Sequence, residues 1–168
     1  MLGLLLIASF VLTFSAGLVD AQDATQRNQE AASAPVWNTK CVSAARRENL
    51  DCSVEQQVVL VKAGQQLLSM VVRIPPESRQ PAMMIHLPLG LFLPGGVTIQ
   101  LDKQKPERLE IQTCDQKGCY AGSAVSEKML ALMKDSERLT ITVQDLGKNN
   151  LSVPVPLKGF AAAYQKIQ

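Results

Sequence analysis

Four cysteines constrain the fold of this chain more than any other feature. Cys41 and Cys52 enclose ten residues, and Cys114 and Cys119 enclose four. An even number of intervening residues lets two cysteines face each other across a β-hairpin, within the distance that a disulfide requires. The spacing therefore predicts the disulfides Cys41–Cys52 and Cys114–Cys119, although four cysteines allow other pairings in principle. A structural zinc site normally uses C-x2-C pairs, which are absent, so we expect no metal and no cofactor.

The first 21 residues have the character of a secretory signal. Residues 1–19 carry no charged side chain, and the small residue Ala21 fits a cleavage site before Gln22. The apolar run is shorter than a bilayer span, although an uncleaved anchor is the alternative. Residues 22–35 are polar and Ala-rich, which predicts a flexible linker, so residues 36–168 form one domain. Disulfides behind a signal predict a periplasmic, secreted or outer-membrane-associated protein.

The domain reads as all-β. Eight short runs rich in Val, Ile, Leu and Thr are separated by turn signals, and they lie at residues 36–42, 54–61, 66–74, 83–89, 97–101, 108–113, 139–143 and 151–157. This pattern favours an antiparallel β-sandwich of the immunoglobulin-like kind over an α/β fold. Leu151, Val153 and Val155 alternate with polar or proline residues, which predicts an inward apolar face. Because Pro154 and Pro156 cannot donate to a ladder, this strand should lie at a sheet edge.

Two helices complete the expected fold. Residues 125–134 have a candidate cap at Ser123 or Ser126, an acidic first turn at Glu127 and one apolar stripe. Residues 160–168 predict a short C-terminal helix that starts after Gly159. The sequence therefore predicts about eight strands, one inserted helix and one terminal helix.

The side chains argue against catalysis and against nucleic-acid binding. A formal net charge of +2 is too small for a polyanion partner. The single histidine, His86, lies in an apolar run that predicts a partly buried strand residue, and no cysteine is spare as a nucleophile. The carboxylates Asp102, Glu107, Glu110 and Asp115 have basic neighbours, as on an ordinary solvated rim, so a hydrolase ranks last among the readings. We therefore predict a protein that is not an enzyme.

One apolar segment stands out as a candidate contact surface. Prolines bracket Leu89, Leu91, Phe92 and Leu93 within residues 88–96, which predicts a stiff apolar corner. The favoured interpretation is a corner that plugs the core. The alternative is an exposed ridge that contacts a partner, because large exposed apolar patches rarely persist without one.

The ordered features resemble the invasion-associated locus B family of bacterial extracytoplasmic proteins. The resemblance covers most of the domain and rests on Trp37 before Cys41, Cys52, the LPLGLFLPGGV segment at 87–97, Leu109, Cys114, Gly118-Cys119, the helix at 125–134, the strand at 139–143 and VPVPLKGF at 153–160. It implies a signal-bearing, disulfide-bonded β-sandwich of the periplasm or envelope, linked in pathogenic members to host-cell entry. The family supplies no catalytic residues to carry over.

Two functional classes follow. The first is a non-catalytic envelope or secreted protein that binds a protein, membrane or glycan surface and aids host-cell invasion, which the resemblance implies. Its partner is an unidentified envelope or host surface, with peripheral membrane contact as one mode and without nucleic acid. The alternative is a structural or stress-related periplasmic protein that supports envelope integrity.

Overall fold

The computed structural model describes residues 37–43, 50–60 and 65–168. The predicted signal segment, residues 1–21, and the predicted linker, residues 22–35, lie outside the described residues. The strands of the described part are β1 Asn38–Val42, β2 Asp51–Leu60, β3 Gln65–Arg73, β4 Ala82–Leu87, β5 Val97–Leu101, β6 Glu107–Leu109, β7 Ile111–Asp115, β8 Gly118–Ala124, β9 Arg138–Gln144 and β10 Asn150–Pro156. The helices are the 3-10 turn η1 Leu93–Gly95, α1 Glu127–Asp135 and α2 Phe160–Gln165.

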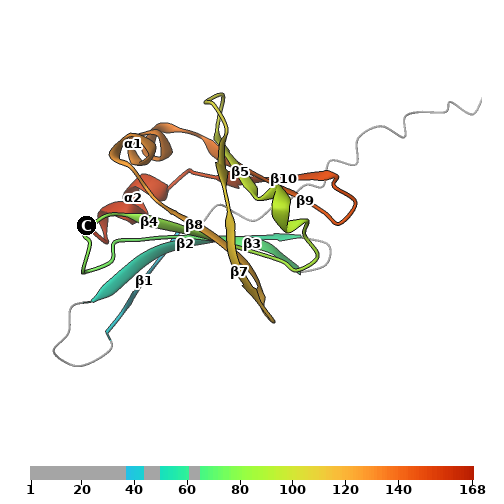
Figure 1. Cartoon of the computed structure of the whole chain (residues 1–168). Coiled ribbons are helices and arrows are strands. Elements are labelled where there is room, and N and C mark those ends of the chain that lie inside the picture. The colour runs from blue at the N-terminus through green and yellow to red at the C-terminus, as the bar shows by residue number, and fades with distance from the viewer. Residues whose placement is uncertain (1–36, 44–49, 61–64) are drawn as a thin grey trace, which may run out of the picture.

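The strands form two antiparallel sheets that face each other across one core (Figure 1). The larger sheet has the order β1-β2-β3-β4-β8-β7, and the smaller has the order β10-β9-β5-β6. Alternate residues of each strand point inward, because successive side chains of a strand lie on opposite faces. The buried inward residues include Val54, Val58, Leu68, Met70, Val72, Met83, Ile85 and Leu87 from the larger sheet, and Val97, Ile99, Leu101, Leu139, Ile141 and Val155 from the smaller. The predicted all-β antiparallel sandwich is confirmed.

Each predicted cysteine pair is bonded across a hairpin. Cys41 lies opposite Cys52 in the β1–β2 pair, and Cys114 lies opposite Cys119 in the β7–β8 pair. Both pairs are disulfides, with a Cα–Cα distance of 4.0 Å in each. The β7–β8 turn also needs Gly118, since a Cβ there would collide with the Leu87 carbonyl and lie 2.5 Å from His86 Nε2. The glycine therefore lets the disulfide hairpin pack closely on β4.

The strand count differs from the prediction in two places. The predicted strand at residues 108–113 is divided at Glu110 into β6 and β7, which belong to different sheets. The strand β8 was not among the predicted runs, although it lies between β4 and β7 within the larger sheet. Its sequence, GCYAGSA, is rich in small residues that have little intrinsic preference for strands. Pairing with β4 and β7 on its two sides outweighs that weak preference.

The edge strand β10 behaves as its prolines predict. It pairs with β9 and ends the smaller sheet, so Pro154 and Pro156 interrupt no ladder on the free side. The Trp37 indole Nε1 donates a hydrogen bond to the Pro156 carbonyl over 3.1 Å. The segment that enters β1 therefore lies beside the last strand of the domain.

Both predicted helices form and pack together at one end of the sandwich, which we call the helix end (Figure 1). Ser126 caps α1, and its hydroxyl accepts a hydrogen bond from the Met129 amide over 3.2 Å. Gly159 adopts a left-handed conformation with φ +89° and starts α2. The ring of Phe160 meets Trp37 edge to face at 4.9 Å between centroids, so α2 seals the core where the chain enters it.

Candidate functional site

Exposed leucines gather at the opposite end of the sandwich. Leu89 and Leu93 lie in the segment after β4, Leu146 lies in the β9–β10 turn, and Leu151 lies at the start of β10. Their exposed fractions are 55%, 47%, 76% and 46%. We call these four exposed residues, together with the buried Leu91, the leucine end of the molecule. The connections that carry them lie together, away from α1 and α2 (Figure 1).

Backbone contacts hold the two main connections of the leucine end together. Leu91 forms an isolated antiparallel bridge with Asp145. The Phe92 amide donates to the Gln144 carbonyl over 2.8 Å, and the Lys148 ammonium lies 5.0 Å from the centre of the Phe92 ring. The segment after β4 and the β9–β10 turn therefore form one structural unit, from which the leucines project.

The predicted contact segment divides between the core and the surface. Leu91 is buried at 8% exposure, Phe92 is partly buried, and Leu89 and Leu93 are exposed. Arg108 supports the segment from β6, because its guanidinium donates to the Pro94 carbonyl over 2.7 Å and to the Gly95 carbonyl over 3.1 Å. The segment thus serves as both a plug and a ridge. A role in binding a partner stays a prediction.

A hollow of about 320 Å³ opens beside these leucines, between the ends of the two sheets. Its walls are mainly apolar and come from β3, β9, β10 and the chain after β4, with Leu68, Leu91, Val143 and Leu151 among them. A neighbouring hollow shares the β3 and Pro88 side and adds His86 and Lys117. Exposed apolar surface of this kind commonly marks an interaction site or a ligand-binding groove.

Two carboxylates near the leucine end, Asp115 and Asp145, accept hydrogen bonds within their own turns. Asp115 accepts hydrogen bonds from the amides of Lys117 and Gly118 over 2.7 and 3.1 Å. These bonds, with the Lys117 amide first, hold the pKa of Asp115 below its usual value. In the β9–β10 turn, hydrogen bonds from the side chain and then the backbone of Asn149 likewise lower the pKa of Asp145. Both carboxylates are therefore tied to their own turns.

The lysines of the same turns lie close to other groups. Lys117 interacts electrostatically with Asp115, and the Lys148 ammonium lies over the Phe92 ring. Arg73 and Asp51, 3.5 Å apart, form the only ion pair in the described part of the chain, and they lie on β3 and at the start of β2. Lys117 and Lys148 are both exposed.

His86 contacts neighbouring groups on the outer face of β4. It is partly buried, as predicted, and its ring stacks on Tyr120 at 4.8 Å between centroids. Its Nε2 lies 3.1 Å from the Lys117 carbonyl. Met83 is buried and Met84 is exposed, because adjacent strand residues point to opposite faces. Within residues 37–43, 50–60 and 65–168, no three His, Cys, Asp or Glu side chains are placed to hold a metal ion.

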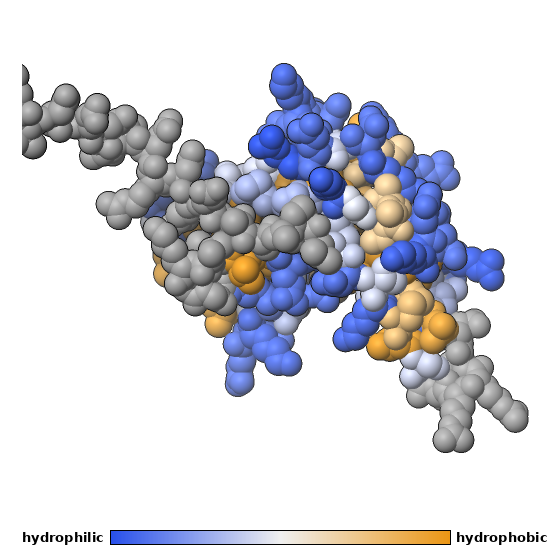
Figure 2. Space-filling view, turned by 180° about the vertical axis from the view of Figure 1, so that it is seen from behind, coloured by the Kyte–Doolittle hydropathy of each residue, from blue (hydrophilic) through white to orange (hydrophobic). Residues whose placement is uncertain are grey.

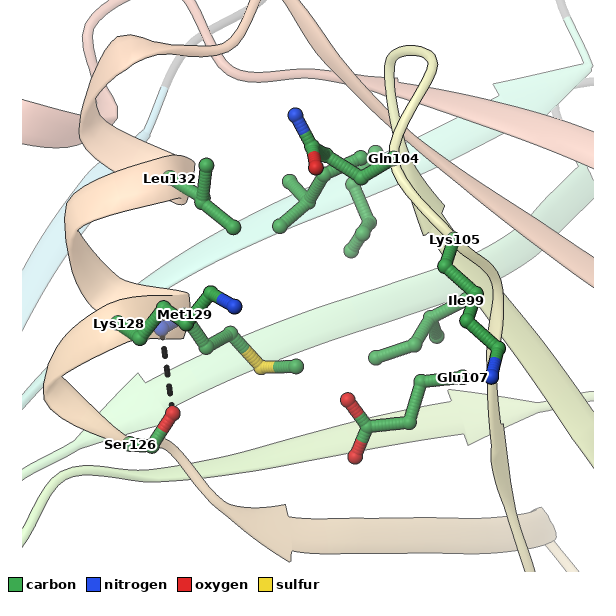
Figure 3. A pocket seen from close by; sticks show the side chains of 10 residues that line it. Ile99, Gln104, Lys105, Glu107, Ser126, Lys128, Met129 and Leu132 are labelled. Carbon is green, nitrogen blue, oxygen red and sulfur yellow. Dashed lines mark hydrogen bonds between the residues drawn. The ribbon is translucent and has the colours of Figure 1, made fainter.

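A smaller hollow of about 220 Å³ lies at the helix end, between α1 and the β5–β6 hairpin (Figure 3). Met129 and Leu132 of α1 point toward Ile99 of β5, and Lys105 and Glu107 line the opposite wall. The remaining carboxylate candidates do not join Glu107 here. Asp102 accepts from the amides of Glu137 and Arg138, while Asp115 lies in the β7–β8 turn. Glu110 lies between β6 and β7 and does not line this hollow. The four carboxylates that stood out in the sequence therefore do not line one site together.

Other exposed apolar residues lie away from the leucine end. Val42 and Leu50, at 50% and 62% exposure, flank the connection between β1 and β2, where the view from behind shows hydrophobic atoms on a largely hydrophilic surface (Figure 2). Met84, at 45% exposure, lies on the outer face of β4. None of the helices in the described residues is long and apolar enough to cross a membrane.

Sequence reasoning identified only part of the leucine end. It selected Leu89, Leu91, Phe92 and Leu93 from their bracketing prolines, but it did not select Leu146 or Lys148, which lie in a polar turn. The available signal was that Leu146 is the only large apolar residue between Asp145 and Asn150. The turn itself does not require an apolar residue at its tip, so a leucine there is a signal of another role.

Comparisons with known proteins agree with one another. The family model described as "Invasion associated locus B (IalB) protein" matches residues 37–168. Invasion protein B homologs from two strains of Brucella abortus, 2308 and biovar 1 strain 9-941, are each 26% identical over 133 residues, which cover 79% of this chain and 75% of theirs. The crystal structure of invasion associated protein B from Bartonella henselae superposes with a TM-score of 0.64 at 21% identity, covering 70% of this chain and 84% of that one. This last similarity concerns the fold.

Proposed function

Because the chain belongs to the invasion associated locus B (IalB) protein family, we propose that it is a non-catalytic exported domain that aids invasion by binding a surface through its leucine end. The observation that carries the proposal is the gathering of three exposed leucines on two connections that share backbone contacts, with a fourth, Leu151, at the start of β10. Water disfavours such a patch, so a partner that covers it gains free energy from burial.

The proposed location is the periplasm or the outside of the cell, including the outer membrane. Two disulfides support this location, because they form and persist in oxidising compartments. The proposal that the domain binds rather than catalyses is supported by the dispersal of Asp102, Glu107 and Asp115 and by the packing of His86 on Tyr120. General acid–base catalysis would require such groups to converge on one substrate atom.

The test compares complemented deletion strains of the source organism for entry into cultured host cells. Wild-type protein should restore entry, whereas a Leu89→Asp, Leu146→Asp double variant should fail to restore it, because two charges would replace the apolar contact. Leu50→Asp is the matched control, since Leu50 is as exposed but lies at the β1–β2 connection. Equal exported amounts, measured by immunoblot, are required for each strain. Full restoration by the double variant would refute the proposal.

A further inference from the structure

The two sheets have four edge strands among the described residues, and three of these are protected against pairing with another chain. In β10, Pro154 and Pro156 remove backbone donors. Strand β6 is only three residues long, and the register of β7 shifts between Ile111 and Thr113. Prolines, short length and irregular register are common means of protecting a sheet edge. The fourth edge strand, β1, has five residues, no proline and an unbroken register with β2 (Figure 1).

The free side of β1 presents backbone groups that its own sheet does not use. Cys41 lies opposite Cys52 with 4.0 Å between their Cα atoms, which is the close spacing of a pair that does not exchange backbone hydrogen bonds. Because the two kinds of pair alternate along an antiparallel ladder, Thr39 and Val54 form a second pair of this kind. The amides and carbonyls of Thr39 and Cys41 therefore point away from β2. All residues of β1 are exposed, and no described strand pairs with it on that side.

We infer that β1 is a second interaction surface, on which an extended segment of a partner polypeptide adds as a strand. The two outward amides and two outward carbonyls match the main-chain groups of such a segment, and this pairing provides the affinity in β-strand addition. The surface goes beyond the proposed function, because it uses none of the leucines.

Lys40 at the middle of β1 selects for a segment with an acidic residue opposite it. Its direct neighbour on β2 is the uncharged Ser53, and the carboxylates of Asp51 and Glu55 lie on the two diagonals. A residue directly opposite in an added strand comes closer than a diagonal one, so an aspartate or glutamate there becomes the nearest opposite charge. A second copy of β1, paired about its middle residue, would instead place two copies of Lys40 opposite each other, which is unfavourable.

The experiment titrates the purified exported protein with two end-blocked, fluorescent peptides, TVTETVT and TVTKTVT, and follows binding by anisotropy and by amide exchange in NMR spectra. In the free protein, the amides of Thr39 and Cys41 should exchange faster than the amide of Lys40, which is bonded to β2. The glutamate peptide should bind and slow the exchange of both outward amides. The lysine peptide should bind about two- to fivefold more weakly. Thr39→Pro removes one outward donor and should weaken binding by at least about fivefold.

A charge reversal keeps the inference testable if Thr39→Pro does not fold. Lys40→Glu should bind the lysine peptide better than the glutamate peptide, whereas Lys103→Glu, at an exposed lysine after β5, should bind as wild type does. Matching circular dichroism spectra establish that these variants are folded. Failure of the glutamate peptide to bind, or binding that leaves the amides of Thr39 and Cys41 unprotected, would overturn the inference. Dimerisation that protects the same two amides without peptide would assign the edge to a second copy and overturn it as well.

Discussion

The two ends of the β-sandwich treat their apolar side chains in opposite ways. At the helix end, α2 covers the gap between the sheets, and Phe160 and Tyr164 are 0% and 1% exposed. The leucine end carries the short 3-10 turn η1 and no α-helix of the described residues, and Leu91 is buried there while Leu146 is 76% exposed. One end of the sandwich is therefore covered by an α-helix, and the other end is not. Phe160 and Tyr164 at the helix end are buried in the core, whereas the four leucines of the leucine end stay exposed to solvent.

The largest expected contrast comes from truncating one apolar side chain at each end. Phe160→Ala should lower the free energy of unfolding by about 3–5 kcal/mol, because it leaves a cavity beside Trp37. Leu146→Ala should change it by less than about 0.5 kcal/mol, since the side chain is largely solvated already. Urea titrations of both variants measure the difference. Similar losses in the two variants would show that the leucine end also supports the core.

The next contrast concerns the two disulfides. Replacing Cys114 and Cys119 with Ala should lower the free energy of unfolding by about 2 kcal/mol, and replacing Cys41 and Cys52 by slightly more, since the longer loop restricts the unfolded chain more strongly. The thermal midpoint should fall by several degrees in each case. Calorimetry of the two double variants, with reduced wild type as the reference, tests the ranking. A larger loss from the Cys114–Cys119 pair would reveal a native-state contribution at the leucine end.

A smaller effect is expected for the histidine beside the leucine end. His86→Ala removes a partly buried ring that stacks on Tyr120, so the free energy of unfolding should fall by about 1 kcal/mol or less. Host-cell entry should be unchanged, because His86 is not one of the exposed leucines of the leucine end. A folded His86→Ala protein that fails to restore entry would place His86 in the functional site.

The smallest effect is a pH dependence in the β7–β8 turn. The pKa of Asp115 is lowered in the folded protein, so its contribution to stability is present above the unfolded value of about 3.9 and is lost as the pH falls through the lower folded value. Asp115→Asn should therefore flatten the stability curve in that acid range and leave its neutral and alkaline parts parallel to wild type. Urea midpoints measured across this range give the slope. An unchanged acid slope would show that other carboxylates, such as Asp145, account for it.

The contrast between the ends also shows how far the sequence can be read. Proline positions predicted the edge strand, even spacing predicted both disulfides, and a cap with an apolar stripe predicted α1, because each of these signals is local. The continuation of β8 beyond the predicted hairpin at Cys119 escaped prediction, because its strand conformation depends on its neighbours. Ala121 is fully buried, and a Cβ on Gly122 would lie 3.0 Å from the Met83 carbonyl. Small residues there fit a crowded sheet, which no local pattern reveals.

The leucine end was predictable only where the chain itself concentrates apolar residues. Leu89 to Leu93 form such a concentration, whereas Leu151 follows the alternation of Val153 and Val155 and was expected in the core. Val155 is fully buried, but Leu151 is 46% exposed, because no residue of the described sheets covers it at that end. The overlap of the two sheets decides which residues of a strand are covered. The alternation of apolar residues within one strand carries no information about that overlap.

The hydrogen bond from Trp37 to Pro156 joins positions 119 residues apart, which has a consequence for the order of folding. The first described residue of the domain and its last strand and helix share one cluster, so closing it requires almost the whole chain to be present. Contacts of such long sequence separation form slowly, and they make the beginning and the end of the domain unfold as one cooperative unit. Amides around Trp37 and those of α2 should therefore exchange with solvent at matching rates. During synthesis from the N-terminus, the core around Trp37 stays uncovered until α2 has been made.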